Sequence, residues 1–237
     1  MATRTPSAPT NRLLSRVSAS DFALLNPYLA RVDLPLRKRL ETHGKPIDYV
    51  YFPDSGFASV VANGHNGAVR GIEVGLIGRE GMTGLAVVMG TDRTPHETFM
   101  QNAGTGWRVA AGNLRRAMEQ SRTLQQSFLL YGHAFIVQAT YTAMANGRSK
   151  LEDRLARWLL MARDRVDSDR LTLTHEFLSM MLGVRRPGVT VAINLLEKAG
   201  LIEASRGATT IIDRKGLERI SNGAYGAAEA EFNRLFG

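Results

Sequence analysis

The sequence contains no cysteine. That absence excludes a disulfide-stapled scaffold, a thiolate nucleophile and any zinc site or iron–sulfur cluster held by cysteine, and it fits a reducing compartment. No apolar run approaches the ~20 residues that a membrane-spanning helix needs, and the N-terminus lacks the hydrophobic core of a secretion signal. We therefore expect a cytoplasmic protein that does not enter a membrane.

Recognisable catalytic motifs are also missing. The five histidines show neither HxH nor HExxH spacing, so a metal centre built on them is not expected. Neither a GxSxG nucleophile elbow nor a GxxxxGK[ST] phosphate loop occurs. These absences predict that the protein is not an enzyme and holds no metal or other cofactor.

What is present suits a soluble chain of two modules. Its 237 residues exceed one ordinary domain, because domains cluster around ~100 to 150 residues. Lys and Arg outnumber Asp and Glu by 30 to 22, which gives a net charge of +8. Such a balance is typical of proteins that meet polyanions such as nucleic acid or anionic lipid, and charge alone does not separate the two.

Composition divides the N-terminal half. Residues 1–11, rich in Thr, Pro and Ala, are predicted to be a flexible tail, and the apolar spacing of residues 11–42 favours helix. Twelve of the 23 glycines fall between Gly56 and Gly112, among short runs such as YVYF and FASVV. Glycine at turn-like intervals is typical of short antiparallel strands, so residues 12–122 are expected to contain a β roll or sandwich.

The middle of the chain is free of charge. Residues 123–147 contain no Asp, Glu, Lys or Arg, and apolar residues recur there in steps of four and three. This predicts a long helix that needs cover on more than one side. Either the helix dimerises with its twin while packing on the β domain, or it is the core helix of a monomer. We favour the dimer, with contacts predicted for Leu124, Phe128, Tyr131, Phe135, Gln138 and Thr142.

Residues 171–221 have the pattern of a helix-turn-helix. Thr174 is suited to cap a first helix, Gly183 supplies a sharp turn, and a second helix begins at Arg186 with a proline in its first turn. Two short strands around the turn at residues 205–207 then form a wing. The segment therefore predicts a winged helix-turn-helix.

A winged helix places its second helix in the major groove of DNA. Arginines at the start of that helix offer guanidinium forks to guanine or to phosphate, and side chains one and two turns later share the same face. The first helix and the wing are placed for backbone contacts, which fix register without reading sequence. The candidate reading residues are Arg185, Arg186, Thr190 and Asn194, and the candidate backbone contacts are Thr174, His175 and Arg206.

The order of these parts resembles the Crp/Fnr family of bacterial transcription regulators. The resemblance covers residues 13–220 and is most specific in LTHEFLSMMLGVRRPGVTVAINLLEKAGLI and in RLARWLL. It implies an α+β fold with a cyclic-nucleotide-binding-like β roll over 12–122, a dimerisation helix over 123–147, a winged helix-turn-helix over 148–220 and a helical extension over 221–237. The implied partners are a second copy of the chain, double-stranded promoter or operator DNA of palindromic sequence, and RNA polymerase.

The recognition helix departs from the family pattern. Family members commonly open it with an Arg and a Glu that read bases, and carry another Arg about a turn later. Arg186 matches the first, but Pro187 stands at the Glu position and Val191 at the second Arg. Because proline cannot make the Glu contact, the operator is expected to differ from the best-known family consensus.

The implied effector pocket departs further. Members that bind cyclic nucleotides carry a Gly-Glu-Leu run followed about ten residues later by Arg-Ser, whose Arg pairs with the cyclic phosphate. Arg93 and Thr94 stand for Arg-Ser here. Met82 and Thr83 occupy the Gly-Glu positions, however, and Glu80 is a nearby carboxylate. We therefore do not expect cAMP binding, the effector stays unassigned, and the candidate effector contacts are Arg93, Thr94 and Glu80.

A second function stays open. Two helices and a hairpin also occur in protein-interaction modules, so the alternative is a degenerate ligand sensor that acts through protein partners without DNA. Salt-dependent, saturable binding to promoter DNA distinguishes the two, because counterion release accompanies DNA binding.

Overall fold

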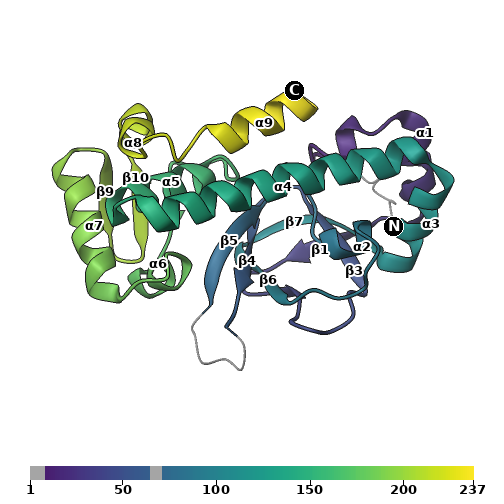
Figure 1. Ribbon diagram of the computed structural model, residues 1–237, viewed down its shortest axis with the longest axis horizontal. Coiled ribbons are helices and arrows are strands. Elements are labelled where there is room, and N and C mark those ends of the chain that lie inside the picture. The colour runs from purple at the N-terminus through teal and green to yellow at the C-terminus, as the bar shows by residue number, and fades with distance from the viewer. Residues whose placement is uncertain (1–8, 65–70) are drawn as a thin grey trace, which may run out of the picture.

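The structure is a computed structural model that describes residues 9–64 and 71–237. It consists of a β roll, one long helix laid across that roll, and a C-terminal unit of short helices with a small sheet (Figure 1). These parts follow one another in the predicted order.

The β roll is built from two antiparallel sheets. Its described strands are β1 Ala30–Leu34, β2 Arg39–Glu41, β3 Tyr49–Pro53, β4 Phe57–Ala62, β5 Ile72–Ile77, β6 His96–Asn102 and β7 Gly104–Ala110. One sheet has the order β1-β7-β3 and the other the order β2-β6-β4-β5. The predicted strand FASVV is β4, and its first five residues are buried, as expected of a continuous apolar run.

The N-terminal segment differs from the helix predicted over residues 11–42. Helical turns are confined to η1 Leu14–Arg16, α1 Ala19–Leu25 and η2 Asn26–Tyr28, after which the chain enters β1 and β2. β1 pairs with β7, more than 70 residues away along the chain. Local spacing carries no information on such a distant partner, which is why the helical prediction was wrong for residues 30–41.

Asn11 also differs from the tail predicted over residues 1–11, of which residues 1–8 lie outside the described part. Its side chain is fully buried. The Asn11 amide donates to the carbonyls of Pro53, at 2.8 Å, and of Gly81, at 2.9 Å. These bonds tie the beginning of the described chain to the β roll.

The long helix is α4, Arg122–Arg148. Ser121 caps it by accepting a hydrogen bond from the Leu124 amide at 3.2 Å. Two shorter helices, α2 Leu85–Val88 and α3 Ala111–Gln120, pack beside it. Although α4 is charge-free over most of its length, no helix within the described residues is long and apolar enough to cross a membrane.

The C-terminal unit contains the predicted pair of helices and hairpin. Its helices are α5 Leu151–Arg163, α6 His175–Met181, α7 Arg186–Lys198, α8 Arg214–Ile220 and α9 Ala227–Phe236. Its strands are β8 Arg170–Thr172, β9 Ile202–Ser205 and β10 Ala208–Ile211, in the sheet order β8-β10-β9. Gly183, between α6 and α7, has a φ of +63°, which glycine adopts without steric cost.

One hydrophobic core joins the β roll to the C-terminal unit. Trp158 of α5 stands edge-on to Phe57 of β4, with ring centroids 6.4 Å apart. Its indole N–H donates to the Glu73 carboxylate of β5 at 2.6 Å. Ile72 packs so close to Gly183 that a Cβ there would lie 2.8 Å from the Ile72 Cδ1. Packing therefore fixes how the two parts sit together.

The last helix, α9, runs back along α4 (Figure 1). Phe232 and Phe236 of α9 stack with centroids 4.9 Å apart and join the core beneath α4. The His133 Nε2 of α4 lies 3.1 Å from the Glu231 carboxylate of α9. As a result, α4 is held between the β roll and the C-terminal helix.

Candidate nucleic-acid interface

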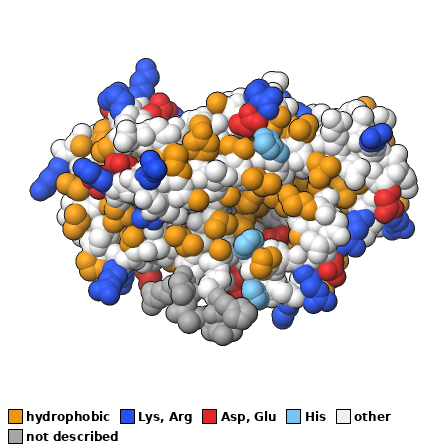
Figure 2. All heavy atoms as spheres, viewed as in Figure 1, with side chains coloured by type: hydrophobic (Ala, Val, Ile, Leu, Met, Phe, Trp, Pro, Cys, Tyr) orange, Lys and Arg blue, Asp and Glu red, His pale blue; other side chains and the backbone are white. Residues whose placement is uncertain are grey.

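Helix α7 presents one face to solvent. Its apolar residues Val189, Ala192, Ile193 and Leu196 are buried at helical spacing, so the intervening positions point outward. Those exposed positions are Arg185, Arg186, Pro187, Thr190, Val191, Asn194, Leu195, Glu197 and Lys198. Lys and Arg side chains are visible at the end of the molecule where α7 lies (Figure 2). The four residues predicted to read bases therefore share one accessible face.

The predicted backbone contacts border this face. Thr174 caps α6 by accepting from the Phe177 amide at 3.2 Å. His175 lies with its Nδ1 3.1 Å from the Thr190 hydroxyl, which ties α6 to α7. Arg206 is exposed in the turn between β9 and β10. The structure thus brings all three within the same unit as the reading residues.

Two apolar residues on the exposed face were not predicted as contacts. Val191 is 58% exposed and Leu195 is 45% exposed. Apolar side chains in a major groove contact the methyl group of thymine. The helical spacing places both residues opposite the buried stripe of α7, which is the signal that could have identified them.

The predicted effector residues do not form one site. Arg93 is exposed, donates to the Gly44 carbonyl at 3.0 Å and lies 3.6 Å from the Asp92 carboxylate. Thr94 accepts from the His96 amide in the same loop. Glu80 instead receives a hydrogen bond from Arg165 at 2.8 Å, on a surface that α9 borders. Glu80 and Arg93 are therefore close in the sequence, but they do not line the same pocket.

A half-buried carboxylate lies at the corner of the β roll where α2 begins. Glu41 accepts a hydrogen bond from the Gly84 amide at 2.7 Å and another from the Thr98 hydroxyl. Burial raises the pKa of Glu41, and these two hydrogen bonds oppose that rise. The Gly84 amide therefore already donates its hydrogen bond to Glu41 of the same chain.

Most of the residues predicted for the dimer contact are covered by their own chain, which corrects that assignment. The Gln138 amide bonds both backbone groups of Leu76, at 2.6 and 3.2 Å. Phe135 lies against Gly75 of β5, where a Cβ would come within 2.8 Å of the ring. Leu124, Phe128 and Tyr131 are buried, and Thr142 is half-buried. The apolar periodicity of α4 predicted which residues form a continuous stripe, but it did not predict that this stripe packs on the chain's own β roll.

A different stripe of α4 is exposed. We call it the α4 seam, and it follows steps of four and three through Arg122, Gln126, Leu129, His133, Ile136, Thr140, Ala143 and Gly147. Leu129 is 44% exposed and Ile136 is 53% exposed. Figure 2 shows hydrophobic side chains along the line of α4. The seam alternates exposed apolar residues with polar ones, and its His133 also contacts Glu231 of α9.

Comparison with known proteins shows which families have a similar sequence or fold. Residues 153–220 match the Crp-like helix-turn-helix domain. No curated protein matches the chain. Within the described residues, no group of three His, Cys, Asp or Glu side chains could hold a metal ion.

Solved structures match nearly the whole chain. A protein from Eubacterium rectale assigned to the Crp/Fnr transcriptional regulators is 18% identical, with a TM-score of 0.70 over 89% of this chain and 98% of its own. FixK2 from Bradyrhizobium japonicum is 15% identical, with a TM-score of 0.69 over 81% and 96%. The c-di-GMP-responsive regulator CLP of Xanthomonas campestris is 16% identical, with a TM-score of 0.65 over 82% and 99%. The chain therefore carries a Crp-like helix-turn-helix domain and has the fold of the Crp/Fnr transcriptional regulators.

Proposed function

We propose that the protein is a DNA-binding transcriptional regulator of the Crp/Fnr type that reads a palindromic operator as a dimer. The observation that carries this proposal is the exposed face of α7, with Arg185 and Arg186 at its tip, inside a Crp-like helix-turn-helix domain. An exposed helix with a cationic start meets the requirement of major-groove docking. A net charge of +8 favours the same partner.

Specificity comes from the first three turns of α7. Arg186 is placed to reach a guanine with a bidentate fork, and Arg185 to hold a phosphate or a base. Val191 and Leu195 add apolar surface for thymine methyl groups. An operator read in this way contains guanine and thymine in each half-site.

The dimer forms through the α4 seam. Leu129, Ile136 and Ala143 recur every seven residues, which is the spacing of a two-stranded left-handed coil. Pairing of this kind delivers two copies of α7 to successive major grooves, about 34 Å apart. We accordingly keep a dimerisation helix over residues 123–147 and a DNA-binding unit over residues 148–220.

The β roll acts as the sensor domain, and cAMP is not its ligand. Glu41 accepts the hydrogen bond of the Gly84 amide at the start of α2. A phosphate bound there would therefore be repelled by the Glu41 carboxylate. Arg93, the residue expected to pair with a phosphate, lies exposed on a loop. RNA polymerase is a further partner of such a regulator, and the cytoplasm is where it would meet its operator.

The test begins with an operator selected from fragmented genomic DNA. Arg186→Ala is expected to lower specific affinity by about 1 to 3 kcal/mol in a mobility-shift titration. Arg16→Ala, which removes an exposed arginine from the β-roll half, serves as the matched control and leaves affinity unchanged. Affinity that is independent of salt, or equal in both variants, would instead favour a sensor that acts through protein partners.

A further inference from the structure

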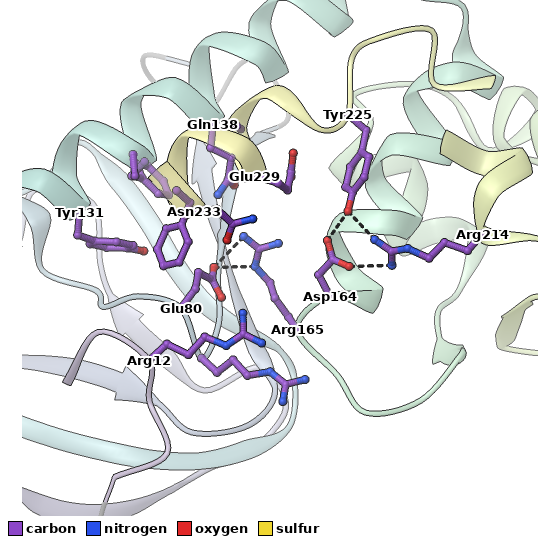
Figure 3. A pocket seen from close by; sticks show the side chains of 15 residues that line it. Arg12, Glu80, Tyr131, Gln138, Asp164, Arg165, Arg214, Tyr225, Glu229 and Asn233 are labelled. Atoms are coloured by element: carbon purple, nitrogen blue, oxygen red, sulfur yellow. Dashed lines mark hydrogen bonds and ion pairs between the residues drawn. The ribbon is translucent and has the colours of Figure 1, made fainter. Parts of the chain in front are cut away.

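A pocket of about 310 Å³ lies where the parts of the molecule meet (Figure 3). We call it the joint pocket. Arg12 comes from the N-terminal segment, Glu80 follows β5, and Phe135 belongs to α4. Arg165 follows α5, and Phe232 lies on α9. We propose that the joint pocket binds a small aromatic monocarboxylate.

Two arginines leave donors for the carboxylate. The backbone amide of Arg12 donates to the Arg79 carbonyl at 2.6 Å, so the two residues are neighbours. The Arg12 side chain is exposed on the pocket and forms no ion pair within the described part of the chain. Arg79 pairs with Asp167 at 2.7 Å, but its buried Nε has no hydrogen-bond partner. A buried donor without an acceptor favours a ligand that supplies one.

Most of the other charges of the pocket are matched by ion pairs, and Glu229 accepts a hydrogen bond from the Gly226 amide at 2.9 Å. Arg165 donates to Glu80 from Nε at 2.8 Å and from its terminal nitrogen at 2.7 Å. Burial alone would lower the pKa of Arg165, but neighbouring carboxylates, Glu80 first, outweigh it and raise the pKa. Arg214 pairs with Asp164 at 2.8 Å (Figure 3). These pairs hold the walls and leave the Arg12 side free for a ligand.

Charge selects a monoanion. The lining holds four arginines and three carboxylates, so one positive charge is in excess. Asp167, the partner of Arg79, is 83% exposed and lies outside the lining, where water screens its charge. A single carboxylate balances the excess, whereas a phosphate dianion would leave an unmatched charge beside Glu80.

The walls select an aromatic body. Tyr131 and Phe135 of α4, Phe232 of α9 and Tyr225 line the pocket. Aromatic rings favour offset or edge-on contact with another ring. The volume lies at the lower end of the range for small-molecule sites, which suits one ring and a short acid.

The position of the pocket gives the ligand a regulatory role, and that role rests on the proposed function. The ligand would contact the β roll, α4, α9 and the residues that follow α5. Its binding therefore stabilises the arrangement in which these parts are together. Ligand binding in the joint pocket would therefore affect the position of the DNA-binding unit directly, and no ligand inside the β roll is needed for this effect. The binding itself does not depend on DNA.

The experiment is calorimetric titration of the full-length protein, without DNA, with benzoate and with phenylacetate. At least one of the two is expected to bind saturably. Phenyl phosphate is expected to bind more weakly, and benzyl alcohol, which has no charge, not to bind. Because DNA is absent, failure of operator binding would leave this result standing.

Variants locate the binding. Arg12→Ala and Arg12→Gln should weaken the binding of the carboxylate about tenfold or more, since each removes a charged hydrogen-bond donor. Arg16→Ala, an exposed arginine four residues away that does not line the pocket, should bind as the unaltered protein does. Circular dichroism confirms that each variant is folded.

Three outcomes would overturn the proposal. They are no binding of either carboxylate to the unaltered protein, equal binding to Arg12→Ala, and tighter binding of phenyl phosphate than of the carboxylates. The last would assign the pocket to a phosphate ligand.

Discussion

Glu73 is a single residue that couples protonation to folding. It is buried on β5 and holds the Trp158 indole N–H at 2.6 Å, while its second oxygen has no partner. Burial raises its pKa from 4.5 to about 7, and the hydrogen bond from Trp158 opposes the rise. Between these two values the folded state holds a proton that the unfolded state has released.

The first prediction concerns this proton. Because the folded state binds it more tightly, the free energy of unfolding should fall as pH rises from 4.5 to about 7, by up to about 1.4 kcal/mol per pH unit. Glu73→Gln should flatten this dependence in urea unfolding measured across the window.

Glu231→Gln is the control for that measurement. A hydrogen bond from Arg234 lowers the pKa of Glu231 to about 2, so this carboxylate stays ionised throughout the window. Its variant should keep the original pH slope. An unaltered slope in Glu73→Gln would show that Glu73 does not hold the proton.

Some residues could be read from the sequence because their chemistry is local. Thr174 caps α6 through a hydrogen bond to a residue three positions later, and Gly183 turns the chain by its own backbone freedom. Glu73 could not be read. It stands in GIEVGLIG as an ordinary strand acid, and only the docking of α5 from elsewhere in the chain buries it.

Helix α4 is the element on which three surfaces meet. One side packs on the β roll, a second lies under α9, and the seam, apart from His133, is left open. The sequence predicted its extent within one residue at each end, because the loss of charge and the apolar spacing are properties of the helix itself. The side of α4 that packs on the β roll is set by the hydrogen bonds between Gln138 and Leu76, and a second side is set by the contact with α9. Local spacing in the sequence reveals neither contact.

The second prediction tests the seam. Ile136→Asp places a charge at the centre of the proposed dimer contact, where an unpaired buried charge costs about 3 to 5 kcal/mol. Sedimentation should show a shift from dimer to monomer, with the circular dichroism spectrum retained because Ile136 is exposed in the single chain.

Ile136→Val keeps the apolar surface and should stay dimeric. A dimer that survives Ile136→Asp would move the interface to another element. Phe135→Asp is not an equivalent test, because Phe135 packs on β5 and its loss would disturb the fold of the chain.

At the scale of the whole molecule, the two parts share one core. Phe57, Val61 and Leu76 of the β roll are buried with the apolar residues of α5 and α7. The sequence predicted both parts and their order, because each has its own periodicity. It did not predict their contact, which depends on Trp158 meeting Phe57 about 100 residues earlier in the chain.

The third prediction uses the chain's two tryptophans, of which Trp107 lies in β7 and Trp158 in α5. Trp158→Phe leaves a fluorescent probe in the β roll, and Trp107→Phe leaves one in the C-terminal unit. In each variant, urea unfolding followed by fluorescence and by circular dichroism should have one common midpoint, because a shared core unfolds cooperatively. Separate midpoints would mean that the parts unfold independently.

The contact between Trp158 and the β roll also limits how this chain can be recombined with others. A chimera joined after α4 would bring a foreign α5 against Phe57 and Glu73, and without an indole there the acid would lose its donor and the ring its neighbour. Exchange of the C-terminal unit of this chain therefore requires that β4, β5 and α5 be transplanted together.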